Sequence, residues 1–589
     1  MNKYTLVSLS VIGGILSGLA WTGWCSGLIL LFSFVPFFLI ENYLYGNPKR
    51  FTPNAFFIFI LPGFVIFSII SLAWMRIASI TGAICVIMGL SFLMAFTTWM
   101  AHIIRLRAGN LPGFISIIVF WLGYEYISLN VNIISPWLNL GNGLSKDILF
   151  IQWYEVTGTA GGSLWILCSN LFLTLFLVNS LTKKRRNELY LIIWLAIIII
   201  PSAISIYRYH TIKHSNRNLS EVVVIQPNTD PYTEKFTIPF QDQLKKVITM
   251  ASAEITNKTD WVITPETTID DPANLDDLAN DKYVMQIKEM AKQHPGINIV
   301  TGLVTYKLYP AMKDAPTVSA RRIDASGLYY DHFNSAVQID TGKSFGIYHK
   351  SKLVPGIEMQ FSNGPGRFIA RILPYLGGTI WGYGMQKDRE CFKHTATSVK
   401  IAPVICYESV FGKFVTDYVK KGAEALFIIT NDGWWKNTNG YKQHLYFASL
   451  RAIETRRPVV RAANTGVSCL IDIRGKRTYE TDWWSKAVIK GDFCPETRIT
   501  IYTRYGDYLL LISSYISGII IFIIFIAIPI RKKINNMDKL EEHIRQKREG
   551  LDRCSPPAGI WRKIRKELRK EKSGNGKSQN RCNTRKYLS

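Results

Sequence analysis

The chain has 589 residues, 48% of them hydrophobic and 19% charged, and a formal net charge of +26. It is too long for a single hydrophobic core, so two or more domains are expected. Much of the excess positive charge lies in short loops beside apolar runs and in the segment after residue 530. This distribution indicates the cytoplasmic flanks of a membrane protein and argues against a nucleic-acid-binding protein.

Eight apolar stretches predict transmembrane helices, because each is close to the ~20 residues that a helix needs to cross a membrane. The first stretch is followed at once by the second without a small-residue cleavage site, so a cleaved signal peptide is not predicted. These two stretches also fit a tight hairpin, and Pro36 and Pro62 are expected to kink their helices. The stretches cover residues 5–22, 26–44, 54–75, 79–101, 112–130, 163–182, 189–207 and 508–530.

Basic residues in the loops predict the orientation of these helices. With a cytoplasmic N-terminus, every strongly basic loop falls on the same side, as the positive-inside rule requires. These loops carry Lys49 and Arg50, Arg105 and Arg107, Lys183 to Arg186, and Arg531 to Lys533. The prediction is a membrane bundle of about seven helices over residues 1–207, an extracytoplasmic domain over 208–507, a transmembrane helix over 508–530 and a basic cytoplasmic tail over 531–589.

Residues 208–507 are predicted to form a soluble α/β domain. Short apolar runs typical of buried strands occur at 221–225, 261–264, 297–302, 336–340 and 425–430, and helical stretches at 240–257 and 281–293 lie between some of them. The tail after residue 530 is basic and poor in apolar residues, so we expect it to be disordered. A basic amphipathic helix over residues 562–572, lying on the inner leaflet, is the alternative.

The nine cysteines are scattered, with no Cys-x-x-Cys pair and no Cys/His cluster of metal-ligand spacing. Neither a metal site nor a disulfide framework is therefore predicted. A single bridge from Cys391 to Cys494 or to Cys469 stays open.

One cysteine has the surroundings of a nucleophile: Cys406 ends the strand-like run 401–405. A thiol attacks as the thiolate, so it needs a base that takes its proton. Acyl transfer also creates an oxyanion, which a nearby ammonium stabilises. Upstream, Glu266 and Lys350 offer these two groups, and Lys352 competes with Lys350. Each residue alone is more often structural, but the three together, in this order, favour catalysis.

Glutamate, lysine and cysteine in this order resemble the catalytic triad of the nitrilase, or carbon-nitrogen hydrolase, superfamily. Such a domain between seven N-terminal spans and one C-terminal span resembles the apolipoprotein N-acyltransferase family, bacterial enzymes that complete lipoprotein maturation. The resemblance covers about residues 5–530, and it implies a four-layer αββα sandwich inserted between the membrane bundle and the C-terminal helix. It rests on motifs at 225–228, 264–267, 333–335, 348–350, 353–355, 405–408, 430–434, 443–444, 451–458 and 463–466.

The resemblance also implies roles for individual residues and no cofactor. Glu266 would be the general base, Lys350 would stabilise the oxyanion, and Cys406 would be the nucleophile. One departure is that the family often reads Pro-Phe-Gly-Glu where this chain has Pro-Gly-Ile-Glu, although the glutamate keeps its spacing from Pro355. Supporting roles would fall to Glu358, which orients Lys350, to Glu408, which orients an incoming amine, and to Tyr407, Asn334 and Trp434, which line or brace the pocket.

The implied reaction moves a fatty acyl chain from a membrane phospholipid, through a cysteine thioester, to the α-amine of a diacylglyceryl-cysteine on a lipoprotein. The enzyme would lie in the bacterial inner membrane with its site at the outer surface, where tryptophans such as Trp434, Trp435, Trp483 and Trp484 also suit the interface. The nearest alternative is a membrane-anchored amidase acting on a small amide. A transporter is disfavoured because Glu41, His102 and Glu125 are isolated or near span ends.

Overall fold

Hydrophobic helices form the N-terminal part of the structure, a computed structural model that describes residues 1–181, 187–315, 319–355, 357–359, 382–527, 537–545, 547 and 559–572. The chain divides into two units, Met1–Gly518 and Ile519–Ser589. Within the described residues, seven segments are long and apolar enough to cross a membrane. They contain α3 (Val35–Tyr45), α4 (Pro53–Leu72), α5 (Ile80–Ala108), α6 (Asn110–Asn130), α8 (Thr159–Leu181), α9 (Asn187–Thr211) and α16 (Tyr508–Phe522).

The first predicted span corresponds to α1 (Lys3–Leu19), which is apolar but has only 17 residues. Pro62 lies inside α4 as expected. The second span, Gly27–Tyr45, is interrupted at Phe34, where α2 (Leu30–Ser33) ends and α3 begins, and Pro36 stands in the first turn of α3. The basic clusters at 183–186 and 531–533 lie outside the described residues.

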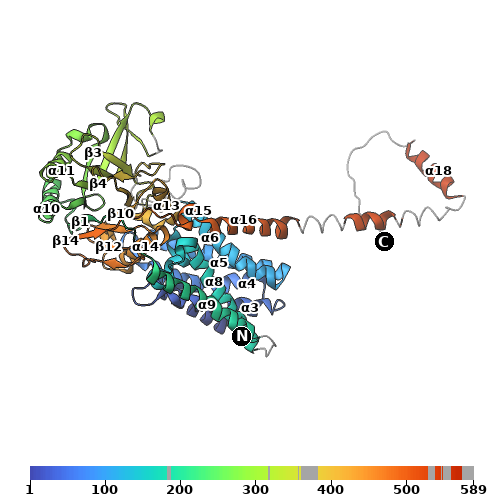
Figure 1. Ribbon diagram of the computed structural model, residues 1–589. Coiled ribbons are helices and arrows are strands. Elements are labelled where there is room, and N and C mark those ends of the chain that lie inside the picture. The colour runs from blue at the N-terminus through green and yellow to red at the C-terminus, as the bar shows by residue number, and fades with distance from the viewer. Residues whose placement is uncertain are drawn as a thin grey trace. The chain divides into compact units, whose positions relative to one another are not determined.

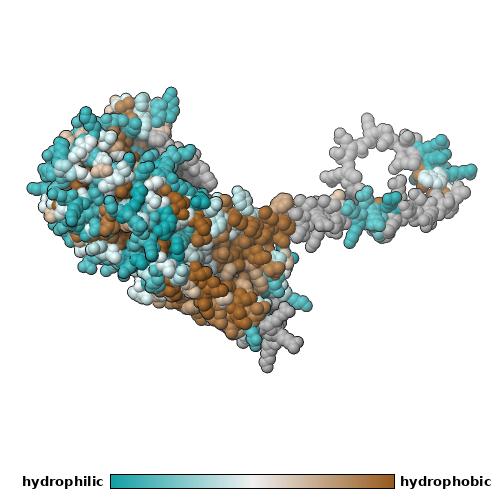
Figure 2. Space-filling view, viewed as in Figure 1, coloured by the Kyte–Doolittle hydropathy of each residue, from teal (hydrophilic) through white to brown (hydrophobic). Residues whose placement is uncertain are grey.

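The bundle packs through small residues and buried ion pairs. A Cβ at Gly14 on α1 would lie 2.1 Å from the carbonyl oxygen of Gly63 on α4, so only glycine permits this approach of the two helices. Glu41 on α3 binds His102 at 2.8 Å and also pairs with Arg105, both on α5. Glu41 and His102 are therefore paired with each other and tie helices together. Figure 2 shows the hydrophobic surface that these helices present beside the polar α/β domain.

Two β-sheets form the centre of the α/β domain, whose position next to the bundle is seen in Figure 1. The first sheet has the order β14-β1-β2-β4-β6-β5, with β3 and β7 paired to β4 and β6, and the second has the order β13-β12-β11-β10-β9-β8. Strand bounds are β1 Ser220–Gln226, β2 Thr259–Ile263, β3 Ile269–Asn274, β4 Asn298–Tyr309, β5 Arg321–Arg322, β6 Tyr329–Ile339, β7 Gly346–His349, β8 Phe392–Lys393, β9 Lys400–Ile405, β10 Ala425–Thr430, β11 Val459–Ala463, β12 Cys469–Ile471, β13 Arg477–Thr478 and β14 Ala487–Phe493.

The two sheets pack face to face, because strands such as β1, β2 and β10 are apolar on both faces. Trp261 on β2 meets the ring of Phe427 on β10 with centroids 5.3 Å apart. Helices α10 (Phe240–Ser252) and α11 (Lys282–Gln293) cover the first sheet, and α13 (Gly412–Lys420) and α14 (Asn439–Thr455) cover the second. The predicted fold class, an αββα sandwich with membrane helices before and after it, is confirmed.

Two expectations need correction or completion. Cys391, Cys469 and Cys494 are free thiols, so neither of the open disulfide pairings forms. In the tail, α18 spans Ile560–Lys572, where disorder was favoured. The amphipathic alternative applies to this stretch, because Ile560 and Ile564 are four residues apart and fall on one helical face. Much of the rest of the tail lies outside the described residues.

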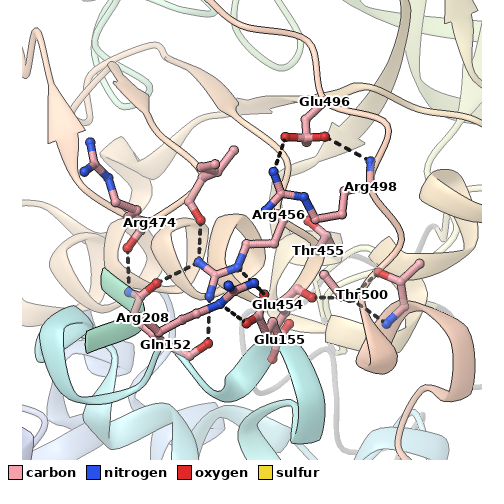
Figure 3. Close-up of polar contacts among 12 residues, drawn as sticks. Gln152, Glu155, Arg208, Glu454, Thr455, Arg456, Arg474, Glu496, Arg498 and Thr500 are labelled. Atoms are coloured by element: carbon pink, nitrogen blue, oxygen red, sulfur yellow. Dashed lines mark hydrogen bonds and ion pairs between the residues drawn. The ribbon is translucent and has the colours of Figure 1, made fainter. Parts of the chain in front are cut away.

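A buried polar network joins the bundle to the α/β domain (Figure 3). Arg456 caps the C-terminus of α14 with φ of 51°. Its guanidinium donates to the side-chain and backbone oxygens of Gln152, at 2.6 and 2.8 Å, and to the Glu155 carboxylate at 2.7 Å. Glu155 also binds Arg208 on α9 at 2.6 Å. Since Arg456 is fully buried, this junction fixes the C-terminal end of α14, the helix whose His444 contacts the backbone of Cys406.

Candidate active site

Cys406 stands at the turn that follows β9, with a left-handed φ of 50°. A non-glycine residue adopts this conformation at a cost, so surrounding contacts must hold it. Its carbonyl oxygen lies 2.8 Å from the Ser409 hydroxyl and 3.1 Å from Nε2 of His444 on α14. The side chain is buried but lines a cavity. The backbone geometry thus presents the sulfur atom into that cavity.

Glu266 and Lys350 meet beside this cysteine. Glu266 follows β2 and Lys350 follows β7, and both strands belong to the first sheet. The Lys350 ammonium donates to Oε1 of Glu266 and to Oε1 of Glu358, both at 2.8 Å. The Asn334 amide donates to the same two atoms at 2.8 and 3.2 Å. Four residues from three separate segments of the chain therefore form one buried hydrogen-bonded cluster.

The electrostatics of this cluster favour an ion pair beside a neutral thiol. Burial raises the pKa of Glu266, but the charge of Lys350 and hydrogen bonds, including one from Cys406, bring it below its ordinary value. Burial lowers the pKa of Lys350, but the charges of Glu266 and Glu358 raise it well above its ordinary value. Burial and the charge of Glu266 raise the pKa of Cys406 well above that of a free thiol. The thiol therefore loses its proton only as the sulfur attacks, and Glu266 is placed to accept it.

The structure separates the two candidate lysines. Lys350 is 1% exposed and bound to two carboxylates. Lys352 instead faces Asn132, with Nζ 3.5 Å from its Oδ1, and lies over the ring of Phe411 at 4.8 Å. Only Lys350 is in the cluster with Glu266, so the geometry favours it for the oxyanion role.

Glu408 and Trp434 are two of the predicted supporting residues. Glu408 is fully buried and accepts hydrogen bonds from the Tyr348 hydroxyl and the backbone N–H groups of Ser351 and Ile405, at 2.6 to 2.8 Å. It fastens the segments that carry Lys350 and Cys406, and its role toward an incoming amine stays a prediction. Trp434 is 36% exposed and packs on Tyr232, because the turn directs its neighbour Trp435 inward instead.

The site also contains residues to which sequence reasoning gave no role. Nδ1 of His444 binds Oδ1 of Asp432 at 2.9 Å, and Arg461 binds Oδ2 at 2.5 Å. Although burial raises the pKa of Asp432, the charges of Arg461 and His444 lower it strongly. Asp432 and Arg461 hold His444 in place, and Nε2 of His444 contacts the carbonyl oxygen of Cys406. The Gln443-His444 and Asn431-Asp432 motifs were noticed in the sequence, but only the fold shows that they meet.

Gln443 links the site to the membrane helices. Its amide oxygen accepts from the indole N–H groups of Trp74 and Trp137, at 3.2 and 2.6 Å. Its amide nitrogen donates to the carbonyl oxygens of Trp21 and Ser71, at 2.8 and 3.1 Å. All four hydrogen-bonding positions of the amide are therefore used by the bundle.

A largely apolar cavity of about 150 Å³ opens at the Cys406 side chain. Its wall combines residues of the catalytic domain with residues of the helical bundle. These are, in part, Tyr407 and Trp435 from the domain and Trp74, Met75, Val86, Ile133 and Trp137 from the bundle. Cys406 lines this cavity, and the base and the ammonium are clustered beside Cys406. A nucleophile in the wall of an apolar cavity, with these two groups next to it, can perform acyl transfer on a substrate with a hydrocarbon chain.

Two family models and several curated relatives match this chain. The carbon-nitrogen hydrolase family model matches residues 222–500, and the model described as apolipoprotein N-acyltransferase N-terminal domain matches residues 13–172. The apolipoprotein N-acyltransferase of Chlorobaculum tepidum is 26% identical over 77% of this chain and 85% of its own length. That of Thermotoga maritima is 25% identical over 87% and 93%. Among solved structures, Saccharomyces cerevisiae Nit3 of the nitrilase superfamily matches 50% of this chain and 96% of its own, with 14% identity and a TM-score of 0.34.

Proposed function

The chain belongs to the apolipoprotein N-acyltransferase family of the carbon-nitrogen hydrolase superfamily, and on this basis we propose that it transfers a fatty acyl chain from a membrane phospholipid to the α-amine of a lipoprotein's diacylglyceryl-cysteine. The observation that carries this proposal is the apolar cavity at Cys406, because residues of membrane-spanning helices form part of its wall. A hydrocarbon chain can pass from the bilayer to the sulfur without crossing water, which would cost about 0.8 kcal/mol per CH₂ group.

In the first step, the Cys406 sulfur attacks the carbonyl carbon of an acyl ester while its proton passes to Glu266. The oxyanion that forms is stabilised by the Lys350 ammonium. The carbon–oxygen bond to glycerol then breaks, Glu266 returns the proton to the departing alkoxide, and a lysophospholipid leaves. The acyl chain remains in the cavity as a thioester on Cys406.

In the second step, the free amine of the lipoprotein's N-terminal cysteine attacks the thioester. Glu266 accepts a proton from this amine, the carbon–sulfur bond breaks, and the thiolate of Cys406 is reprotonated by Glu266. Oδ1 of Asn334 is buried and has no hydrogen-bond partner among the described residues. It is therefore an available acceptor for the second N–H of the amine, next to the base.

The location of the reaction follows from the same proposal. Lys49 and Arg50 lie in the loop after α3, and Arg105 and Arg107 lie in the last turn of α5. These basic residues indicate that the bundle has its cytoplasmic face at the ends of α3 and α5. The α/β domain then lies on the extracytoplasmic side of the bacterial inner membrane. Lipoprotein and phospholipid both keep their acyl chains in this bilayer, so a membrane-anchored enzyme meets both.

The test is mass spectrometry of the intact protein after incubation with a phospholipid labelled in its acyl chains. Without an acceptor, we expect one labelled acyl adduct on Cys406, which disappears when a diacylated lipopeptide is added and becomes N-acylated. Cys406→Ala should give no adduct and no product, and Cys494→Ala, which removes another free thiol, should behave as the parent. Acylation by Cys406→Ala would refute the assignment. Release of free acid and ammonia from a small amide, without N-acylation, would favour an amidase.

A further inference from the structure

A second cavity, also of about 150 Å³, lies where the α/β domain meets the ends of two spans. Leu129 and Asn130 at the end of α6 contribute to its wall, and so does Asp507, directly before α16. Because α6 and α16 are both long and apolar enough to cross the bilayer, the cavity lies at the depth where they leave it. The phosphate groups of membrane lipids occupy this depth.

Three cations line this cavity, and none of them has a carboxylate within ion-pair distance in the described part of the chain. They are Lys352, Arg389 and Lys413. The Arg389 guanidinium lies 3.7 Å from the centroid of the Phe414 ring and donates through Nη1 to the Ser351 hydroxyl at 3.1 Å. Its Nε is buried without a hydrogen-bond partner among the described residues. Burying a charged donor in this way is costly unless an acceptor binds there.

The two acidic residues of the wall also have partners outside it. Asp417 pairs with Lys420 at 3.5 Å, and Asp507 accepts from the Tyr502 hydroxyl at 2.6 Å and interacts electrostatically with Lys413 and Arg451. Three cations and two carboxylates line the cavity, so positive charge is in excess there. Burial and the nearby charges of Arg389 and Lys413 lower the pKa of Lys352, so an anion bound here would relieve an existing repulsion.

We propose that Lys352, Arg389 and Lys413 form a phosphate-binding site that holds the headgroup of a membrane phospholipid. Guanidinium and ammonium groups together suit a phosphate, because each gives short charge-assisted hydrogen bonds to its oxygens. This inference deepens the proposed function and rests on it, since it assigns the place of the donor's headgroup.

The position of this site relative to Cys406 fits a single lipid. Lys352 and Val354 stand two residues apart on the same segment, and Val354 lines the apolar cavity. Phe411, which lines the cationic cavity, packs on Tyr407 of the apolar one with centroids 5.2 Å apart. The two cavities are therefore neighbours separated by one layer of side chains, so the phosphate and the acyl ester of one phospholipid can occupy them together.

The test measures lipid binding without turnover. Full-length protein carrying Cys406→Ala, purified in detergent, is titrated with phosphatidic acid or with diacylglycerol of the same acyl chains, and bound lipid is counted by native mass spectrometry. We expect phosphatidic acid to bind at least about tenfold more tightly. Lys352→Gln, Arg389→Gln and Lys413→Gln combined should abolish this preference. Lys352→Arg with Lys413→Arg should keep it.

Controls separate the possible results. The exposed lysines Lys245, Lys258 and Lys476, changed to Gln together, remove the same charge and should leave the preference intact. Displacement of phosphatidic acid by inorganic phosphate at equal concentration would assign the same site to a free anion. A preference that persists in the triple variant, or is absent from the parent, would overturn the proposal. Failure of the parent cysteine to form an acyl adduct would instead overturn the proposed function and leave the binding result standing.

Discussion

Replacing Gln443 by methionine should change which acyl chains the enzyme uses. Methionine has a similar length and volume but cannot make the four hydrogen bonds of the amide. Trp137 loses its indole partner and the Trp21 carbonyl loses a donor, whereas the Trp74 indole keeps a bond to Ser71 at 3.0 Å. Two buried polar groups left unsatisfied cost about 1–3 kcal/mol each. The variant therefore loses ~2–6 kcal/mol of the free energy that stabilises the packing of these tryptophans around Gln443.

The effect should depend on chain length, because Trp74 and Trp137 line the cavity but do not touch the base or the ammonium. Each ~1.4 kcal/mol that reaches the transition state lowers the rate tenfold. We expect adduct formation from a long-chain phospholipid to fall about 10- to 100-fold, and formation from a soluble acetyl thioester to change less than about threefold.

The assay is the rate of adduct formation on Cys406, followed by quenched-flow mass spectrometry for both donors. Gln241→Met, the same change at an exposed position on α10, is the matched control and should behave as the parent. Equal losses with both donors would refute the reasoning, because they would mean that Gln443 positions the nucleophile and not the tryptophans that line the apolar cavity. An unchanged rate with the long-chain donor would refute it as well.

Three further predictions concern Glu266 as the base, the buried carboxylate of Glu408, and the Arg456 network between the bundle and the α/β domain. Glu266→Gln should slow adduct formation about 10²- to 10⁴-fold, and a rate near that of the parent would exclude Glu266 as the base. The folded-state pKa of Glu266 lies below its ordinary 4.5, so its ion pair stabilises the fold above that pH, and this stabilisation is lost as the pH falls through the folded-state pKa. The parent's melting temperature should therefore drop on acidification below about pH 4.5. Glu266→Gln should make this drop smaller. Glu408→Ala should lower the melting temperature by removing the acceptor of three buried donors, whereas a raised KM for the lipopeptide with unchanged stability would support its predicted role toward the amine. Arg456→Met should cost about 3–5 kcal/mol by leaving buried partners unpaired, seen as a lower denaturation midpoint, and Glu155→Gln combined with it should cost little more if the two act as one network.

Much of the architecture could be predicted from local sequence. A stretch of apolar residues long enough to cross a bilayer, or a short apolar run ended by proline, is a property of consecutive residues, and β1, β2 and β10 lie where such runs occur. One local prediction was incomplete. The tail was expected to be disordered, although 560–572 is helical.

The three residues proposed for catalysis were also chosen from sequence, because a thiol, a base and an ammonium have defined chemical roles that motifs preserve in order along the chain. The choice between Lys350 and Lys352 rested on the resemblance alone. The two lysines stand two residues apart, so the alternation of a strand would place them on the same face. Only the tertiary structure separates them, because the chain leaves β7 at His349 and then directs Lys350 to Glu266 and Lys352 to Asn132.

The sequence by itself does not predict which groups, distant along the chain, contact one another. The contacts of Gln443 with Trp21, Trp74 and Trp137 and the inward turn of Trp435 arise where the bundle and the α/β domain pack together. The burial of Glu408 arises within the α/β domain, where it meets Tyr348 and Ser351. Hydropathy is a property of consecutive residues, and motifs keep their order along the chain. These two features predicted the membrane helices, the strands and the three residues proposed for catalysis. Side chains hundreds of positions apart form the apolar cavity at Cys406, so only the packing of the folded chain decides its shape.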